Sequence, residues 1–360
     1  MKKNILIMCS SSYQILVAMR IIEERFQEDN IDIVITDTIA QSDSLYARMK
    51  KEKIFSNVYF WKVKGKFDFS KKQILKDAIS GYKRSYKLAD DCGCKDKSYD
   101  VFLYANLSLF AMHLGIVLLH NNKKIKVEMF EDGFSTYSEY VGAFFNNSNF
   151  KKRFLRKFFF KTSALYVFNP EIMGWKPHFD LYRIHPDYQG ACLETINRIF
   201  DYYSLKDTYE ASLIFFEESY AADGRKVDDV ELVESIAEYV GKENIFVKIH
   251  PRNPTNRFSE RGYTTNSNIS IPWEVILINK PFDRTVFVTM ASNAAMNPYF
   301  LFQKKTPSFL LFNCTSTPDA LYKQIIEYDR KLCSAHPDVF YIPQNKEQLK
   351  KQLLEIFGKE

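Results

Sequence analysis

The feature that most constrains the fold is a regular alternation of short apolar runs with longer stretches of helical periodicity. The run Asn4–Cys9 (NILIMC) is followed by helix-like periodicity over residues 14–26, and the next apolar run covers residues 31–36. Continuous apolar runs of this length are typical of buried strands. Their alternation with helices predicts βαβ units and a doubly wound parallel sheet.

The same alternation continues along the chain of 360 residues, which is long enough for two domains of about 100–200 residues each. We expect one α/β domain over residues 1–205 and a second over residues 206–360. The polar segment 62–97 is interpreted as an insertion with one helix. Further strands are expected at residues 57–61, 100–105, 125–130, 164–168, 180–184, 212–216, 244–249, 284–290 and 309–312. Further helices are expected at residues 43–53, 107–120, 230–239, 273–279, 294–302, 320–328 and 346–357.

Net charge and cysteine usage narrow the class of protein. The net charge of +6 suits an anionic ligand or membrane lipids, and no nucleic-acid-binding signature accompanies it, so we expect no nucleic acid partner. The six cysteines show neither disulfide-scaffold nor zinc spacing, which indicates reduced thiols in the cytoplasm. No run of about 20 apolar residues is present, so we expect no membrane-spanning helix.

A cluster of basic residues surrounds a Phe-rich stretch between Lys151 and Lys161. On a helix this pattern predicts a basic amphipathic surface that lies on an anionic membrane, here the inner face of the cell membrane. The alternative is a core helix with a solvated basic flank. The cations of the cluster are Lys151, Lys152, Arg153, Arg156, Lys157 and Lys161.

An acidic motif, Glu131-Asp132-Gly133, directly follows the expected strand at residues 125–130. Loops at the carboxyl ends of parallel strands are where open α/β sheets bind ligands. Asp132 can project from such a loop while Gly133 gives the backbone its tight turn. Asp132 is therefore a candidate general base for an acceptor hydroxyl, and Glu131 a candidate acceptor contact. The alternative is an ordinary Asp-Gly turn with a solvated acid.

A basic motif (KIHPR) closes the expected strand at residues 244–249. Its histidine, His250, can donate a hydrogen bond to a phosphate and protonate it as it leaves. His185 also precedes a proline and follows a short expected strand, so it is the competing histidine. The groups beside His250 that add positive charge or fix the chain direction are Lys248, Pro251 and Arg252.

Three further segments offer binding groups. Ser292 follows a strand and is placed to cap a helix whose N–H groups, with Asn293 beside them, can hold a phosphate. Glu274 lies in the first turn of an expected helix, where it can accept hydrogen bonds from ribose hydroxyls. The turn after the first strand can hold an acceptor sugar, although plain helix capping is the alternative for both serine segments. Its candidate residues are Ser11, Ser12 and Gln14.

These motifs, in this order, resemble those of the bacterial lipooligosaccharide and capsule sialyltransferases of glycosyltransferase family 52. The resemblance implies two Rossmann-like domains that face a central cleft, the GT-B architecture. It implies an inverting, metal-independent transfer of sialic acid from CMP-sialic acid to a terminal sugar, with galactose expected, and no cofactor. Asp132 would act as the base and His250 would face the CMP phosphate. Glu274 would bind the nucleoside and Ser292 the phosphate.

Three alternatives stay open on the sequence alone. The chain resembles a scaffold that also serves UDP-hexose or CMP-Kdo transferases, and a non-catalytic protein that binds nucleotides or glycans would use the same fold. A homodimer is also left open. The sequence carries no Gly-rich dinucleotide fingerprint, no Walker loop and no convincing Asp-x-Asp motif, so no metal site is expected.

Overall fold

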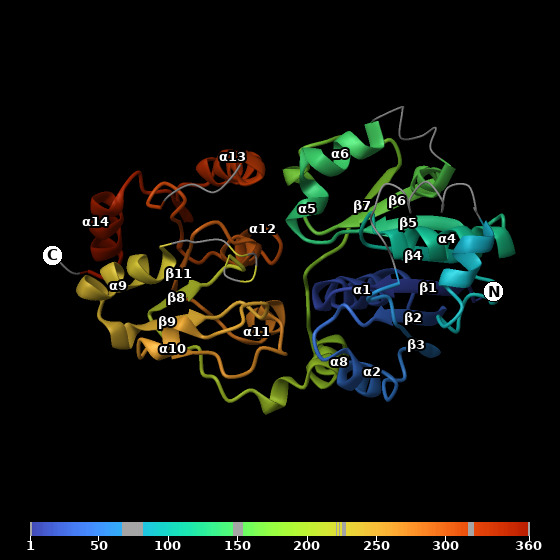
Figure 1. The fold of residues 1–360 in the computed structure, drawn as a ribbon, viewed down its shortest axis with the longest axis horizontal. Helices are drawn as coiled ribbons and strands as arrows, with labels where there is room; N and C mark the ends of the chain where they lie inside the picture. Colours follow the sequence, from blue (N-terminus) through green and yellow to red (C-terminus); the bar gives the residue numbers. More distant parts are fainter. Residues whose placement is uncertain are drawn as a thin grey trace. The chain divides into compact units, whose positions relative to one another are not determined.

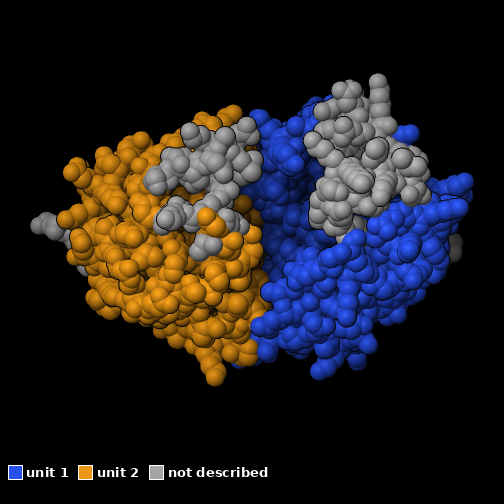
Figure 2. All heavy atoms as spheres, viewed as in Figure 1, with its two compact units in different colours: residues 1–203 blue, residues 204–360 orange. Residues whose placement is uncertain are grey.

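The computed structural model describes residues 2–66, 82–146, 154–220, 222, 224, 228–315 and 320–358, with backbone alone for 154–156 and 320–325. The chain divides into two compact units, Met1–Tyr203 and Ser204–Glu360 (Figure 2). The division falls two residues before the boundary expected from the sequence. No helix in the described part of the chain combines the length and the apolarity that crossing a membrane requires.

The first unit is built on a seven-stranded parallel sheet in the order β3-β2-β1-β4-β5-β6-β7 (Figure 1). The inner strands are buried almost end to end, as in β1, where Ile5 to Cys9 are at most 3% exposed. Strands that are apolar throughout need cover on both faces, which the helices provide. The strands are β1 Asn4–Cys9, β2 Asn30–Thr36, β3 Asn57–Trp61, β4 Val101–Tyr104, β5 Lys126–Phe130, β6 Thr162–Val167 and β7 Asp180–Arg183.

The helices of the first unit follow the predicted pattern up to residue 121, but three α-helices that the structure describes between residues 134 and 200 were not predicted. The helix α8 was not predicted, although its buried residues Cys192, Ile196 and Ile199 recur at helical spacing. It packs against α1 and α2. The helices are α1 Ser12–Arg25, α2 Ser42–Met49, α4 Leu109–Asn121, α5 Phe134–Tyr137, α6 Glu139–Asn146 and α8 Gly190–Phe200, with 3-10 helices η1 Phe154–Lys161, η2 Pro170–Ile172 and η3 Tyr202–Ser204.

The Phe-rich part of the basic cluster belongs to the core. Within η1, Phe158 and Phe159 are each 3% exposed, and their rings pack against Tyr104. Lys157 and Lys161 are exposed. The core interpretation therefore holds for these two phenylalanines, which cannot form a surface stripe. The first three cations of the cluster, from Lys151 to Arg153, lie outside the described residues.

The second unit is built on a six-stranded parallel sheet in the order β10-β9-β8-β11-β12-β13 (Figure 1). Its core gathers apolar side chains from the sheet, such as Phe215 and Val288, and from the helices, such as Ile236 of α9 and Leu349 of α14. The strands are β8 Leu213–Phe216, β9 Ile245–Lys248, β10 Thr264–Thr265, β11 Val286–Thr289, β12 Ser308–Leu310 and β13 Phe340–Tyr341. The helices are α9 Asp229–Val240, η4 Lys242–Asn244, α10 Arg257–Glu260, α11 Trp273–Asn279, η5 Asn293–Ala295, α12 Asn297–Phe300, α13 Ala320–Ser334 and α14 Lys346–Ile356.

One predicted helix of the second unit is divided. The segment 294–302 forms the short η5 and α12, because Pro298 has no N–H to donate to the carbonyl of Ala294 four residues earlier. The indole Nε1 of Trp273 donates to that carbonyl instead, at 3.0 Å. A contact from another helix thus replaces the bond that the proline removes.

Candidate active site

In both sheets the polar motifs follow strands near the point where the strand order reverses. In the first sheet the reversal lies between β1 and β4, and in the second it lies between β8 and β11. Open α/β sheets bind ligands beyond the carboxyl ends of the strands at such a point. Each unit therefore presents one candidate binding region.

Asp132 stands at this position in the first unit, and both of its carboxylate oxygens are held by amides. Gln14 Nε2 donates to Oδ1 at 2.8 Å, and Asn106 Nδ2 donates to Oδ2 at 3.0 Å. The Asp132 N–H donates to Thr136 Oγ1 at 2.7 Å. Gly133, with φ of 67°, makes the turn that follows. The carboxylate is half-buried, so it is both fixed and accessible to a hydroxyl.

The residues of the turn after β1 hold Asp132 and cap the helix α1, and acceptor binding by Ser11 and Ser12 stays a prediction. Gln14 is 1% exposed, and its Oε1 accepts the N–H of Ser10 at 2.6 Å. Ser11 caps α1 by accepting the Gln14 N–H at 3.2 Å. Ser12 is the first residue of α1 and is half-buried. Direct acceptor binding by Gln14 is not supported, because its side chain is buried and its amide is bound to Asp132.

Glu131 is fully buried, which corrects its expected role as an acceptor contact. The hydroxyls of Tyr13 and Tyr137 each donate to one of its oxygens, and the Phe168 N–H donates to Oε2 at 2.7 Å. Burial raises the pKa of Glu131 to about 7, although these hydrogen bonds act in the opposite direction. Glu131 therefore stabilises the loop of Asp132 through hydrogen bonds in the interior of the first unit.

Asn106 is a site residue that the sequence analysis missed. It follows β4, which pairs with β1, so its side chain lies close to Ser10 and Asp132. The available signal was a polar residue directly after an expected strand. The strand order, which the sequence does not display, is needed to see that this strand ends beside Asp132.

His250 stands beyond β9 in the second unit, in a loop tied by backbone bonds. The Arg252 N–H donates to Nδ1 of the ring at 3.2 Å, and the Asn253 N–H donates to the His250 carbonyl at 3.0 Å. An acceptor Nδ1 leaves the proton of the neutral ring on Nε2. Pro251 and Arg252 are exposed, and Arg252 Nη2 donates to Ser219 Oγ at 2.7 Å.

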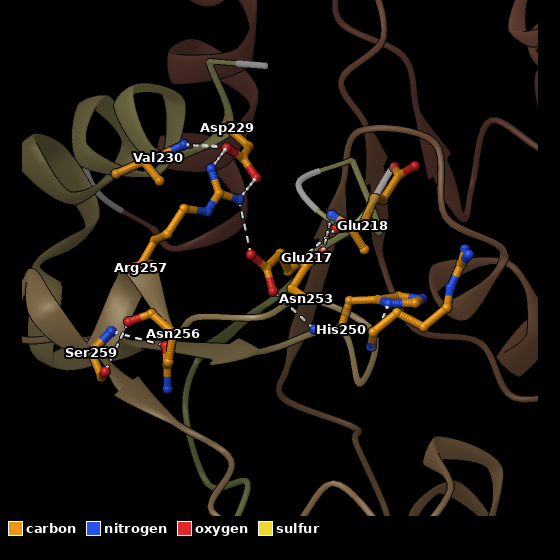
Figure 3. Close-up of polar contacts among 11 residues, drawn as sticks. Glu217, Glu218, Asp229, Val230, His250, Asn253, Asn256, Arg257 and Ser259 are labelled. Carbon is orange, nitrogen blue, oxygen red and sulfur yellow. Dashed lines mark hydrogen bonds and ion pairs between the residues drawn. The ribbon is translucent and has the colours of Figure 1, made fainter. Parts of the chain in front are cut away.

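A buried ion-pair network lies behind this loop (Figure 3). Glu217 Oε2 accepts the His250 N–H at 2.9 Å, and Arg257 Nη2 donates to Glu217 Oε1 at 2.9 Å. Arg257 also binds both oxygens of Asp229, at 2.9 and 2.7 Å. The sequence analysis missed this network. Glu217, directly after the expected strand at 212–216, was its only local signal.

Ser292 caps η5 as predicted, and most N–H groups of its turn are occupied within the unit. Ser292 Oγ accepts the Ala294 N–H at 3.3 Å, and the Ser292 N–H donates to Thr289 Oγ1 at 3.0 Å. The Ala291 N–H donates to a carboxylate oxygen of Glu218. Asn293 is exposed.

Glu274 and Lys248 influence one another electrostatically in the second unit. Burial raises the pKa of Glu274, while the charge of Lys248 and the 3.2 Å hydrogen bond from Asn297 Nδ2 oppose that shift. Burial lowers the pKa of Lys248, and the negative charge of Glu274 opposes this. The pair thus places one acidic and one basic group, both half-buried, within electrostatic reach of one another.

His185, the competing histidine, has a local structural role. Its N–H donates to Glu24 Oε1 at 2.8 Å, and its carbonyl accepts from Arg20 Nε at 2.8 Å. It follows β7, an edge strand. Over the ranges that the structure describes, no group of three or more His, Cys, Asp and Glu side chains is arranged to hold a metal ion.

Solved structures with similar folds include three nucleotide-sugar proteins. A Listeria monocytogenes protein assigned as a UDP-N-acetylglucosamine 2-epimerase aligns at TM-score 0.53 and 12% identity, over 99% of this chain and 88% of that one. A UDP-glucosyltransferase from Polygonum tinctorium aligns at 0.52 and 10%, over 99% and 90%. UGT2 of Phytolacca americana, complexed with UDP-2-fluoro-glucose and pterostilbene, aligns at 0.53 and 10%, over 98% and 90%. At these identities the likeness shows the fold alone, and with the two parallel-sheet units it confirms the expected GT-B class.

Sequence comparison identifies the family. No curated protein sequence matches the chain. The sequence model of the alpha-2,8-polysialyltransferase family (POLYST) matches residues 5–310, which include all of β1 but its first residue and every motif discussed above. The match supports the sequence-based resemblance at the level of sialyltransferases and does not bear on the narrower assignment to glycosyltransferase family 52. The chain belongs to the alpha-2,8-polysialyltransferase family and is therefore placed among the sialyltransferases, which are glycosyltransferases.

Proposed function

We propose that this protein transfers sialic acid from CMP-sialic acid to the terminal sugar of a surface lipooligosaccharide or capsular polysaccharide, with inversion and without a metal ion. The observation that carries the proposal is Asp132, a half-buried carboxylate held by two amides that follow β1 and β4, the strands between which the first sheet reverses its order. Membership of a sialyltransferase family supplies the reaction class.

In the proposed reaction, Asp132 accepts the proton of the acceptor hydroxyl as the hydroxyl oxygen attacks the anomeric carbon of sialic acid. The bond from that carbon to the CMP phosphate breaks, and CMP leaves with the electron pair. The Nε2–H of His250 donates to the departing phosphate, with the hydroxyl of Ser292 and the positive charges of Lys248 and Arg252 as further stabilising groups. Glu274 binds the ribose.

The family description bears on which acceptor we propose. An α-2,8 linkage of a polysialyltransferase joins one sialic acid to another, which favours an acceptor that ends in sialic acid over the galactose expected from the sequence. Transfer assays with both acceptors, matched in every other respect, distinguish the two.

The decisive experiment compares the wild type with Asp132→Asn. General base catalysis contributes roughly 10²- to 10⁴-fold, so the variant should retain less than about a tenth of the transfer rate and keep its affinity for CMP. A thermal-shift panel of CMP, CDP, UDP and GDP, with and without EDTA, tests the donor. A shift selective for UDP would instead favour a hexose transferase, and no shift with any nucleotide would favour a non-catalytic protein.

A peripheral position on the inner face of the cell membrane completes the proposal. The described cations of the basic cluster, Lys157 and Lys161, are exposed. Each basic residue near an anionic surface contributes about 1 kcal/mol of attraction. Glutamine at both positions should weaken cosedimentation with anionic liposomes and leave transfer to a soluble acceptor unchanged. Equal cosedimentation would remove these residues from the membrane proposal.

A further inference from the structure

The ion-pair network of Glu217, Asp229 and Arg257 lies beside residues 250–253, which we call the His-Pro loop. Its acidic side chains are buried, so each needs its cation as a partner. The side chains of Glu217 and Asp229 are 0% and 2% exposed, and that of Arg257 is 29% exposed. Buried carboxylates are costly unless they are paired. Burial on its own would lower the pKa of Arg257, but its hydrogen bonds to Asp229 and Glu217 outweigh burial and raise it. The guanidinium therefore stays charged and keeps a cation between the two acids.

Glu217 divides its two oxygens between Arg257 and the backbone of His250. Oε1 accepts from Arg257 Nη2, and Oε2 accepts the His250 N–H, each at 2.9 Å. An ionised carboxylate forms a stronger hydrogen bond to a backbone N–H than a neutral acceptor does. The anchoring of His250 therefore depends on the carboxylate of Glu217, whose other oxygen is paired with Arg257.

The same loop sets the orientation of the imidazole ring. The N–H of Arg252 reaches Nδ1, and Asn253 ties the loop to the turn after β8 through its Nδ2, which donates to the Glu218 carbonyl at 2.8 Å. Figure 3 shows Glu217, His250 and Asn253 grouped at this position. A displacement of the His250 backbone would alter the contact to Nδ1, and with it the direction of Nε2.

We propose that Glu217 and Arg257 are positioning residues for His250, which hold its backbone so that Nε2 is directed at the donor phosphate. This inference rests on the proposed function, because it takes His250 to be the group that faces the phosphate. Neither Glu217 nor Arg257 needs to touch the donor. Their effect on donor binding passes through His250.

A double-mutant cycle on CMP affinity tests this dependence. Because Glu217→Gln replaces the ionised acceptor of the His250 N–H with a neutral amide oxygen, it should weaken CMP binding about 10-fold in the wild-type background. In the His250→Ala background the same substitution should cause no further loss, since the residue it positions is gone. Equal losses in both backgrounds would overturn the inference.

A second readout does not depend on CMP. The chain has six histidines, and the imidazole nitrogen resonances of His250 are those that disappear in His250→Ala. Glu217→Gln and Arg257→Lys should each shift these resonances, and unchanged resonances in both variants would overturn the inference even if CMP binds elsewhere. A third outcome separates the two proposals. If His250→Ala leaves CMP affinity intact while Glu217→Gln and Arg257→Lys shift the His250 resonances, the positioning role stands and the phosphate role of His250 fails.

Arg261→Gln is the matched control. Arg261 directly follows α10 and pairs with Glu234 at 2.6 Å, but this pair is exposed and does not contact the His-Pro loop. Its removal should change neither the His250 resonances nor CMP affinity. Circular dichroism of each variant checks folding. If Glu217→Gln does not fold, the same measurements are made on Arg257→Lys, which keeps the positive charge.

Discussion

At the scale of single residues, amide side chains hold the proposed base in place. Asp132 sits between Gln14 and Asn106, and each amide donates to a different oxygen. Two donors fix one rotamer of the carboxylate, so the proton acceptor is in position before substrate binds. Such preorganisation raises the rate without contributing to donor affinity.

Asn106→Ala should therefore lower kcat by about 10- to 100-fold, the loss expected when one hydrogen bond to a charged group is removed. The affinity for CMP should stay within twofold of wild type on this proposal, because the residues assigned to the donor belong to the second unit. Steady-state kinetics and CMP titration measure the two quantities. Asn122→Ala is the control, since Asn122 donates to the Tyr99 carbonyl away from Asp132. A normal kcat in Asn106→Ala would contradict the positioning of Asp132 by Asn106.

At the scale of elements, much of the secondary structure could be predicted from the sequence, whereas the site geometry could not. Strands such as the buried β1 and the edge strand β3 carry their own apolar signal, and α11 was predicted with both ends correct. Pro298 divides a predicted helix because it has no N–H to donate, and only the partner that takes the freed carbonyl, Trp273, is distant in sequence. Glu131 was predicted to contact the acceptor, but its carboxylate is buried and accepts hydrogen bonds from Tyr13 and Tyr137. These contacts depend on which strands and helices become neighbours, which local patterns do not specify.

The contact between α4 and η1 yields a prediction at this scale. A Cβ added at Gly115 would lie 2.1 Å from Cε2 and 2.3 Å from Cζ of Phe158. In an exposed helix, alanine in place of glycine would stabilise by about 1 kcal/mol. Here Gly115→Ala should destabilise the first unit by about 1–3 kcal/mol, because a buried ring must move. Urea denaturation measures the change, and the double variant Gly115→Ala/Phe158→Leu should recover part of it. A stabilised single variant would show that the ring shifts freely.

At the scale of the whole molecule, the two units carry separate cores, and their stabilities can be followed separately. Of the three tryptophans, Trp61 and Trp175 belong to the first unit and Trp273 to the second. In the second unit Asp329 of α13 is 2% exposed, and its Oδ2 has no hydrogen-bond partner among the described residues. Burial, with a smaller contribution from the charge of Glu218, raises the pKa of Asp329 to about 7.

This shift gives the second unit a pH-dependent stability. An acid whose folded pKa is raised stabilises the fold below its unfolded pKa of about 4, and that stability is lost as pH rises through about 7. Asp329→Asn should therefore be more stable than wild type at pH 8, by about 2–4 kcal/mol, and lose this advantage toward pH 4. Denaturant unfolding followed by Trp273 fluorescence, with phenylalanine at the other two tryptophan positions, measures it. Asp338→Asn, at an exposed ion pair with Lys305, should show no such trend. A parallel pH profile for both variants would contradict the account.

The order of strands in the first sheet also determines when the nascent chain can fold. β1 pairs on one side with β2 and on the other with β4, so that Ile5 lies opposite Val101. A ribosome that adds about 5–20 residues per second needs roughly 5–20 s to make the stretch between them. During that interval β1 can pair with β2 but not with β4. The backbone of its second edge is therefore open to pairing with other chains. Early synthesis is therefore a stage at which a chaperone can shield this edge of β1 from other chains.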